Sequence, residues 1–193
     1  MINIILFGPP GAGKGTQSAK IIEKYSLLHI ATGDLFRKHL KDGTPLGNLA
    51  KEYMNKGNLV PDQLVIDMVD DKINSTENVT GIIFDGFPRT IPQAEALDKL
   101  LTSKGAPIKV LIELVVPEDE LRKRLAERAI KENRPDDAKP EVIDNRIAVY
   151  KGETVAVADY YKNLGKYSSV VGVGEIENIF SNICREIDKS LLL

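Results

Sequence analysis

A glycine-rich segment near the start of the chain constrains its fold more than any other feature. The segment, Gly8–Thr16 (GPPGAGKGT), follows the short apolar run Asn3–Phe7 and precedes a helical pattern over Ser18–Lys24. Glycines let backbone N–H groups converge on phosphate oxygens, the start of a helix adds a favourable dipole, and Lys14 supplies a compact positive charge. Because a strand before the glycines and a helix after them make such a match specific, the segment predicts a phosphate-binding loop (P-loop).

Short apolar runs alternate with helical patterns along the rest of the chain. The runs are rich in β-branched residues and apolar at consecutive positions, as in strands covered on both faces. They are Asn3–Phe7, the weaker Leu27–Ile30, Ile82–Phe84, Ile108–Val116 and Ser168–Val171. The clearest helical patterns lie over Ser18–Lys24, Asp62–Ile73 and Ile176–Ile187. This alternation predicts an α/β fold, a doubly wound parallel five-stranded sheet with helices on both faces.

Two segments fit the alternation poorly. Residues 31–60 are helical in pattern with glycine and proline breaks, and residues 127–137 are short and polar. Insertions between core elements are where ligand-covering flaps occur. We therefore expect a single domain over 1–193, with a core of residues 1–30, 61–126 and 138–193, a small helical insertion over 31–60 and a short lid over 127–137.

Charge and cysteine content argue against several classes of protein. The net charge of −2 provides no overall basic surplus of the kind that nucleic-acid-binding proteins carry. Cys184 is the only cysteine, so neither a disulfide framework nor a multi-cysteine zinc site can form within one chain. The N-terminus lacks the positive region of a signal peptide, and no apolar stretch approaches the length of a membrane span. We expect a cytoplasmic protein with no nucleic-acid or membrane partner.

Two further motifs follow the glycine-rich loop, namely Thr32–Arg37 (TGDLFR) and Asp85–Thr90 (DGFPRT). Together the three resemble the adenylate kinase family, in order and over essentially the whole chain. The resemblance implies reversible Mg²⁺-dependent phosphoryl transfer from ATP to AMP, giving two ADP, with ATP and AMP as small-molecule partners of a monomer. It also implies that residues 31–60 bind the nucleoside monophosphate (NMP) and that the lid is of the short form.

The loop departs from the general P-loop pattern directly after Lys14, where Gly15 stands and Thr16 follows one residue later. Because the usual metal-binding hydroxyl is displaced, we expect phosphates and water near Asp85 to hold Mg²⁺, without a metal ligand from the chain. Asp85 ends a predicted strand, where its carboxylate either reaches the metal shell through water or caps the following turn. The short lid lacks the four-ligand metal knuckle of long-lid bacterial forms, so no structural zinc is expected.

Gln93 is the residue on which the choice of acceptor depends. A carboxamide offers a donor and an acceptor that match N1 and N6 of adenine, although a lone glutamine is more often an ordinary helix residue. Met54 either packs against the base or is a plain helix-face methionine. By resemblance, AMP is bound by Thr32, Arg37, Asn58, Leu59, Val60, Gly86, Phe87, Pro88, Arg89, Gln93, Arg134 and Arg146.

Four arginines surround the predicted lid. Arg124 and Arg128 lie four residues apart on one helix face, which is either solvated or directed at phosphate. Arg134 precedes Pro-Asp-Asp, and Arg146 comes one residue later than the usual family spacing. By resemblance, the catalytic residues are Lys14, Arg89, Arg124, Arg134 and Arg146. The same resemblance assigns ATP binding to Gly11, Ala12, Gly13, Lys14, Gly15, Thr16, Arg128 and Gly174.

Alternatives to an adenylate kinase remain at this point. A UMP/CMP kinase shares the motifs, but such enzymes usually carry asparagine-rich sequence after the arginine, where this chain has Thr90–Ala94 (TIPQA). A nucleotide-sensing module would bind without turnover, yet Lys14, Arg89 and the lid arginines are all present. A GTPase is disfavoured because the chain has no Asn-Lys-x-Asp sequence.

Overall fold

A parallel sheet forms the centre of the protein in a computed structural model that describes residues 1–132 and 139–192. Its five strands run in the order β2-β3-β1-β4-β5, and each bound lies within one residue of the sequence prediction. The strands are β1 (Ile2–Phe7), β2 (Leu28–Ala31), β3 (Gly81–Asp85), β4 (Ile108–Val115) and β5 (Tyr167–Val171). The predicted doubly wound sheet is confirmed.

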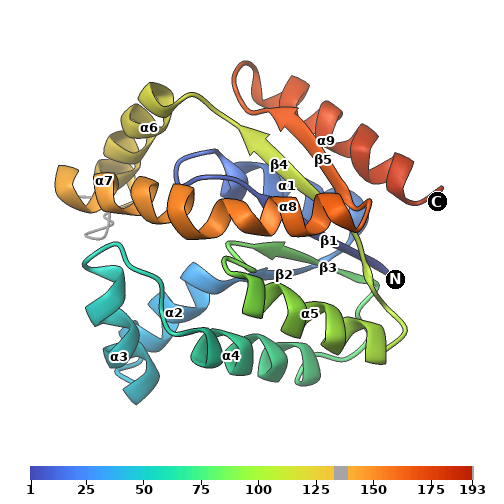
Figure 1. Ribbon diagram of the computed structural model, residues 1–193, viewed down its shortest axis with the longest axis horizontal. Coiled ribbons are helices and arrows are strands. Elements are labelled where there is room, and N and C mark those ends of the chain that lie inside the picture. The colour runs from blue at the N-terminus through green and yellow to red at the C-terminus, as the bar shows by residue number, and fades with distance from the viewer. Residues whose placement is uncertain (133–138, 193) are drawn as a thin grey trace.

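Helices cover both faces of the sheet (Figure 1). They are α1 (Lys14–Tyr25), α2 (Thr32–Lys41), α3 (Pro45–Met54), α4 (Asp62–Asn74), α5 (Ile91–Ser103), α6 (Glu118–Lys131), α7 (Pro140–Val149), α8 (Val155–Asn163) and α9 (Ile176–Ser190), with a π-helical turn, η2 (Tyr150–Thr154), between α7 and α8. Among the described residues, no helix combines the length and the apolar character needed to cross a membrane.

The central strands β1, β3 and β4 are apolar at consecutive positions because each contributes side chains to two cores. Along β1, Ile5 and Phe7 pack with residues of α4, α5 and α8, whereas Ile4 and Leu6 pack with α1 and α9. All four side chains are at most 4% exposed. Successive side chains of a strand point to opposite faces, so burial on both sides requires an unbroken apolar run.

Residues 31–60 and the described start of the second interrupting segment, residues 127–132, lie on the same side of the molecule (Figure 1). Residues 31–60 contain α2 and α3, which Figure 1 shows below α6 and α7. The expected lid start at Glu127 falls inside α6, which continues to Lys131. The last turn of this helix holds no buried residue, and Lys131 Nζ lies 4.0 Å from Glu127 Oε2 at helical spacing. Residues 133–138, which include Arg134, Asp136 and Asp137, lie outside the described part of the chain.

Candidate active site

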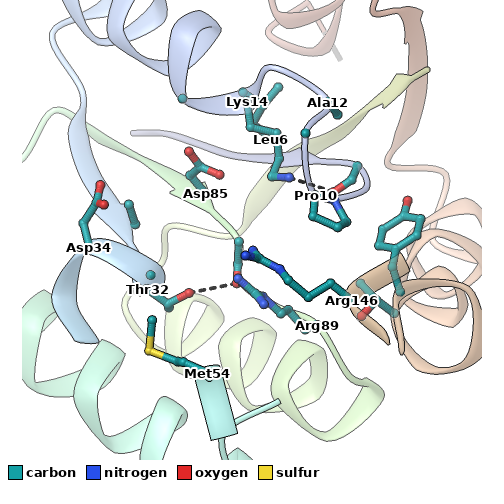
Figure 2. A pocket seen from close by; sticks show the side chains of 18 of the residues that line it. Leu6, Pro10, Ala12, Lys14, Thr32, Asp34, Met54, Asp85, Arg89 and Arg146 are labelled. Carbon is teal, nitrogen blue, oxygen red and sulfur yellow. Dashed lines mark hydrogen bonds between the residues drawn. The ribbon is translucent and has the colours of Figure 1, made fainter. Parts of the chain in front are cut away.

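A cavity of about 530 Å³ opens at the carboxyl ends of β1 and β3. Ligands of doubly wound sheets bind at this edge, where the strand order reverses on either side of the first strand. The cavity is lined by the glycine-rich loop, the start of α2, the segment from Gly57 to Val60, the turn after β3, and residues of α6 and α7. Figure 2 shows Lys14 of the loop, Thr32 of α2 and Arg89 of the turn around it. It therefore joins the core to both interrupting segments.

Glycines allow the loop to pass close to neighbouring elements. A Cβ at Gly11 would lie 2.9 Å from the Leu121 carbonyl oxygen of α6, and Gly11 has φ +84°. Gly13 has φ +92° and precedes α1 without any side-chain cap. The first N–H groups of α1 therefore have no capping side chain and can donate to an anion.

Lys14 folds back over the loop that precedes it. Its Nζ donates to the carbonyl oxygens of Gly8 at 2.8 Å and Pro9 at 3.0 Å. Burial lowers the pKa of Lys14 to about 8, and the nearby positive charge of Arg89 acts in the same direction, partly offset by Asp85. A phosphate beside this ammonium group would restore its preference for the charged form.

Asp85 lies opposite Lys14 at the end of β3. Its Oδ2 accepts a hydrogen bond from Ser18 Oγ at 3.3 Å and lies 3.7 Å from His29 Nε2. Burial raises the pKa of Asp85, but the adjacent His29 ring and the charges of Lys14 and Arg89 outweigh it, so the pKa is lowered overall. The carboxylate is therefore ionised at neutral pH. Among the described residues, no group of three His, Cys, Asp or Glu side chains could hold a metal ion.

Arg89 and Arg146 point into the same part of the cavity, as Figure 2 shows. Arg89 is held by its Nε, which donates to the Gly86 carbonyl oxygen at 2.7 Å. Burial, and then the positive charge of Arg146, lowers the pKa of Arg89 to about 10, so the guanidinium keeps its proton at neutral pH. Like charges gathered in this way are stabilised when an anion binds between them.

The insertion joins the cavity through polar contacts. Buried Thr32, the first residue of α2, donates from Oγ1 to the Gly86 carbonyl oxygen at 2.9 Å. Met54 and the segment from Asn58 to Val60 line the cavity from the insertion. Arg37 also lines it and forms an ion pair with Asp34.

Asn145 of α7 was not predicted as a site residue. Its Nδ2 donates to the Lys56 carbonyl oxygen at 2.7 Å and to Asn58 Oδ1 at 2.8 Å. Beside it, a Cβ at Gly57 would lie 2.9 Å from the Val142 carbonyl oxygen. The insertion therefore packs directly against α7, a contact that no local sequence pattern predicts.

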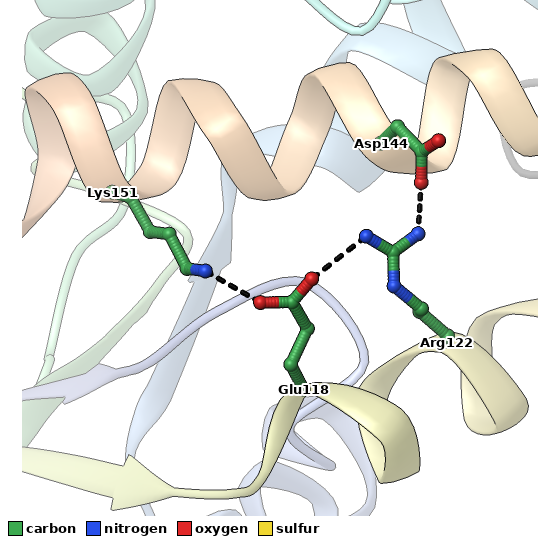
Figure 3. A network of polar contacts seen from close by, with 4 residues as sticks. All are labelled: Glu118, Arg122, Asp144 and Lys151. Carbon is green, nitrogen blue, oxygen red and sulfur yellow. Dashed lines mark hydrogen bonds and ion pairs between the residues drawn. The ribbon is translucent and has the colours of Figure 1, made fainter.

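The arginines of α6 divide between two faces. Arg124 donates to Glu120 Oε1 at 2.7 Å and to the Gly172 carbonyl oxygen at 3.0 Å, and it lines the cavity together with Arg128. Arg122 is partly exposed and bridges Glu118 of its own helix and Asp144 of α7 (Figure 3). The network ends at Lys151 of η2, whose Nζ lies 2.5 Å from Glu118 Oε2. It fastens α6 to the helices that follow.

The structure brings most of the predicted site residues into one cavity. All predicted residues of the loop, of the insertion and of α6 line it, as do Gly86, Pro88, Arg89, Gln93 and Arg146. Phe87 does not, because its side chain is 2% exposed and packs in the core beside Phe84. Gly174 is also absent from the lining residues, and Arg134 lies outside the described residues.

Comparison with known proteins agrees with this geometry. A family model described as adenylate kinase matches residues 6–166. A protein of Bacteroides fragilis named adenylate kinase is 48% identical, with 97% of this chain and 99% of the relative covered. The adenylate kinase of Flavobacterium psychrophilum is 45% identical and that of Methanothrix thermoacetophila 41%, each with 97% of this chain and 99% of the relative covered.

Proposed function

The chain belongs to the adenylate kinase family, and from that membership we propose which of its residues carry the reaction. It is a nucleoside monophosphate kinase that transfers a phosphoryl group from ATP to AMP. Neither a UMP/CMP kinase nor a binding module without turnover is favoured, because the relatives are consistently named adenylate kinase.

The glycine-rich loop is proposed to hold the phosphates of ATP. Backbone N–H groups from Gly11 to Thr16 would donate to the phosphate oxygens, and Lys14 would follow the transferred group as its negative charge shifts. Arg124 and Arg128 would neutralise the same phosphates from α6, since both line the cavity.

AMP is proposed to bind on the insertion side of the cavity. Arg89, Arg146 and Arg37 would hold its phosphate, which is already largely dianionic at neutral pH because its second pKa is about 6. No general base is then needed, and the protein accelerates transfer by alignment and charge neutralisation. The observation that carries the proposal is the convergence of Lys14, Arg89 and Arg146 on one cavity.

Mg²⁺ is proposed to enter with ATP. The ionised Asp85 would bind water of the metal shell, and Ser18 would fix that carboxylate. The bound ion would neutralise charge on the ATP phosphates during transfer. Gly15 offers no hydroxyl to the metal, so phosphate and water would supply most ligands.

Residues 31–60 are proposed to close over AMP, and residues 127–137, the short lid, over ATP, excluding water that would compete as acceptor. We further propose that the protein works as a monomer in the cytoplasm, since one chain supplies every group named above and its single cysteine suits a reducing compartment.

Replacing Lys14 tests the assignment. Lys14→Met should lower turnover by about two orders of magnitude or more while the thermal melting temperature stays close to that of the parent. Lys20→Met is the matched control on the same helix, because Lys20 pairs with Glu177 at 2.7 Å outside the cavity. A folded Lys14→Met protein with parental turnover would refute the proposed role.

The acceptor assignment needs its own assay. Turnover should be measured with AMP, CMP, UMP and GMP under one set of conditions, and we expect a clear preference for AMP. A preference for CMP or UMP would contradict the assignment of AMP as the acceptor.

A further inference from the structure

The carboxamide of Gln93 is held at both of its ends. Its Oε1 accepts a hydrogen bond from the backbone N–H of Arg89 at 2.8 Å, and its Nε2 donates to Asp62 Oδ1 at 2.8 Å. Gln93 is 1% exposed yet lines the cavity. Both contacts come from outside its own helix, one from the turn after β3 and the other from the start of α4.

These two partners can be satisfied by only one orientation of the amide. A backbone N–H can only donate, and an ionised carboxylate can only accept. Turning the Gln93 amide over would set N–H against the N–H of Arg89 and oxygen against the carboxylate of Asp62. Each of these mismatches leaves buried polar groups without a partner, which is costly.

Asp62 is itself fixed in place. It is the first residue of α4, directly after Pro61, and its Oδ1 also accepts from Thr90 Oγ1 at 2.9 Å. Thr90 caps α5 by accepting from the Gln93 N–H at 3.4 Å. The carboxylate therefore joins the starts of α4 and α5 and meets the glutamine at a set position.

One N–H and one oxygen lone pair of Gln93 remain for a ligand, and their order is fixed. Adenine presents a donor at N6 beside an acceptor at N1. A 6-oxopurine presents the reverse, an acceptor at O6 beside a donor at N1. A freely turning carboxamide could pair with either edge, whereas a locked one pairs with adenine only.

We propose that Asp62 is a positioning residue that determines specificity: it locks the Gln93 amide so that the site accepts 6-aminopurine and rejects 6-oxopurine monophosphates. The inference rests on the proposed function, in which Gln93 reads the acceptor base. Cytosine shares the donor and acceptor order of adenine, so Asp62 does not act against CMP, which differs from AMP in size.

The test compares AMP with inosine monophosphate (IMP), which has almost the same shape but the reversed edge. Dissociation constants for both are measured by isothermal titration calorimetry. In Asp62→Ala, the ratio of IMP to AMP dissociation constants should fall about tenfold or more, because AMP binds more weakly and IMP more tightly. Asp62→Asn, which keeps the size of the side chain, should lower the ratio in the same direction, because its amide can pair with either orientation of Gln93 and only the Arg89 N–H then favours one of them.

Asp67→Ala is the matched control. Asp67 lies on the same helix and also accepts from a glutamine, Gln63 Nε2 at 2.7 Å, but on the exposed surface. This variant removes the same charge from α4 and should leave the ratio unchanged. A purely structural role of Asp62 would weaken both ligands equally, so an unchanged ratio in folded Asp62→Ala or Asp62→Asn overturns the inference.

Variants of Gln93 separate this inference from its premise. Gln93→Ala should abolish most of the discrimination, and adding Asp62→Ala to it should change the ratio no further. If Gln93→Ala leaves the ratio intact, the proposed base reading itself is wrong. If Gln93→Ala collapses the ratio but Asp62→Ala does not, only the role of Asp62 is refuted.

Discussion

ATP binding should take up a proton onto Lys14 at alkaline pH. Burial lowers the pKa of this ammonium to about 8, and bound phosphate should return it toward its ordinary value of 10.5. With a pKa of about 8 in the free protein, Lys14 is about half charged at pH 8 and about one-tenth charged at pH 9. Binding should therefore take up about 0.5 proton at pH 8 and about 0.9 at pH 9. Because the complex holds more protons than the free protein, affinity falls as the pH rises, by nearly tenfold per unit between about pH 9 and pH 10, and the fall levels off above the pKa of the bound state.

Calorimetric titration with Mg·ATP in two buffers of different ionisation enthalpy measures this uptake directly. The terminal phosphate of ATP is already deprotonated above about pH 8 and contributes little. Lys14→Arg is the control, since a guanidinium stays charged across this range and should show almost no uptake. Uptake close to zero at pH 9 in the parent, or equal uptake in the parent and Lys14→Arg, would show that Lys14 does not take up the proton.

Three further substitutions test the contacts that α7 makes with the insertion and with α6 around the cavity. Gly57→Ala should lower the free energy of unfolding in urea by about 1–3 kcal/mol and weaken AMP binding. Gly57 has φ +75°, and a Cβ there would lie 2.9 Å from the Val142 carbonyl oxygen. A variant as stable as the parent would contradict this. Asn145→Ala removes both hydrogen bonds to the insertion and should raise the KM for AMP several-fold with little change for ATP, so equal effects on both would count against it. Leu125→Ala should lower the free energy of unfolding by about 2–5 kcal/mol, because the fully buried Leu125 of α6 packs against Ile143 and Ile147 of α7. A loss well under 1 kcal/mol in a denaturant titration would be inconsistent with that packing.

The strands were predictable because their signal is local. A strand buried on both faces must be apolar at consecutive positions, as β1, β3 and β4 largely are, and their predicted bounds agree with the structure to within one residue. The edge strands β2 and β5 are less buried, yet their predicted bounds also agree to within one residue. The end of α6 lacked such a signal. From Glu127 to Lys131 three of the five residues are charged, so the apolar periodicity fades, and the sequence assigned this segment to the short lid.

The residues of the site likewise include some that were predictable from local sequence and some that were not. The residues from Gly8 to Thr16 act as one continuous segment, so the sequence alone identified them. The partners of Gln93 and Asn145 could not be identified from the sequence, because Asp62 lies 31 residues from Gln93 and Asn58 lies 87 residues from Asn145. Such pairs exist only after the helices are brought together by the sheet and the insertion.

The central claim is that donor and acceptor nucleotides occupy one continuous cavity with their phosphates meeting at Lys14, Arg89 and Arg146. Titration with two adenosines joined by five phosphates tests it most directly. We expect one molecule to bind per chain and to compete with both ATP and AMP. Competition with only one of the two nucleotides, or binding of two molecules per chain, would contradict it.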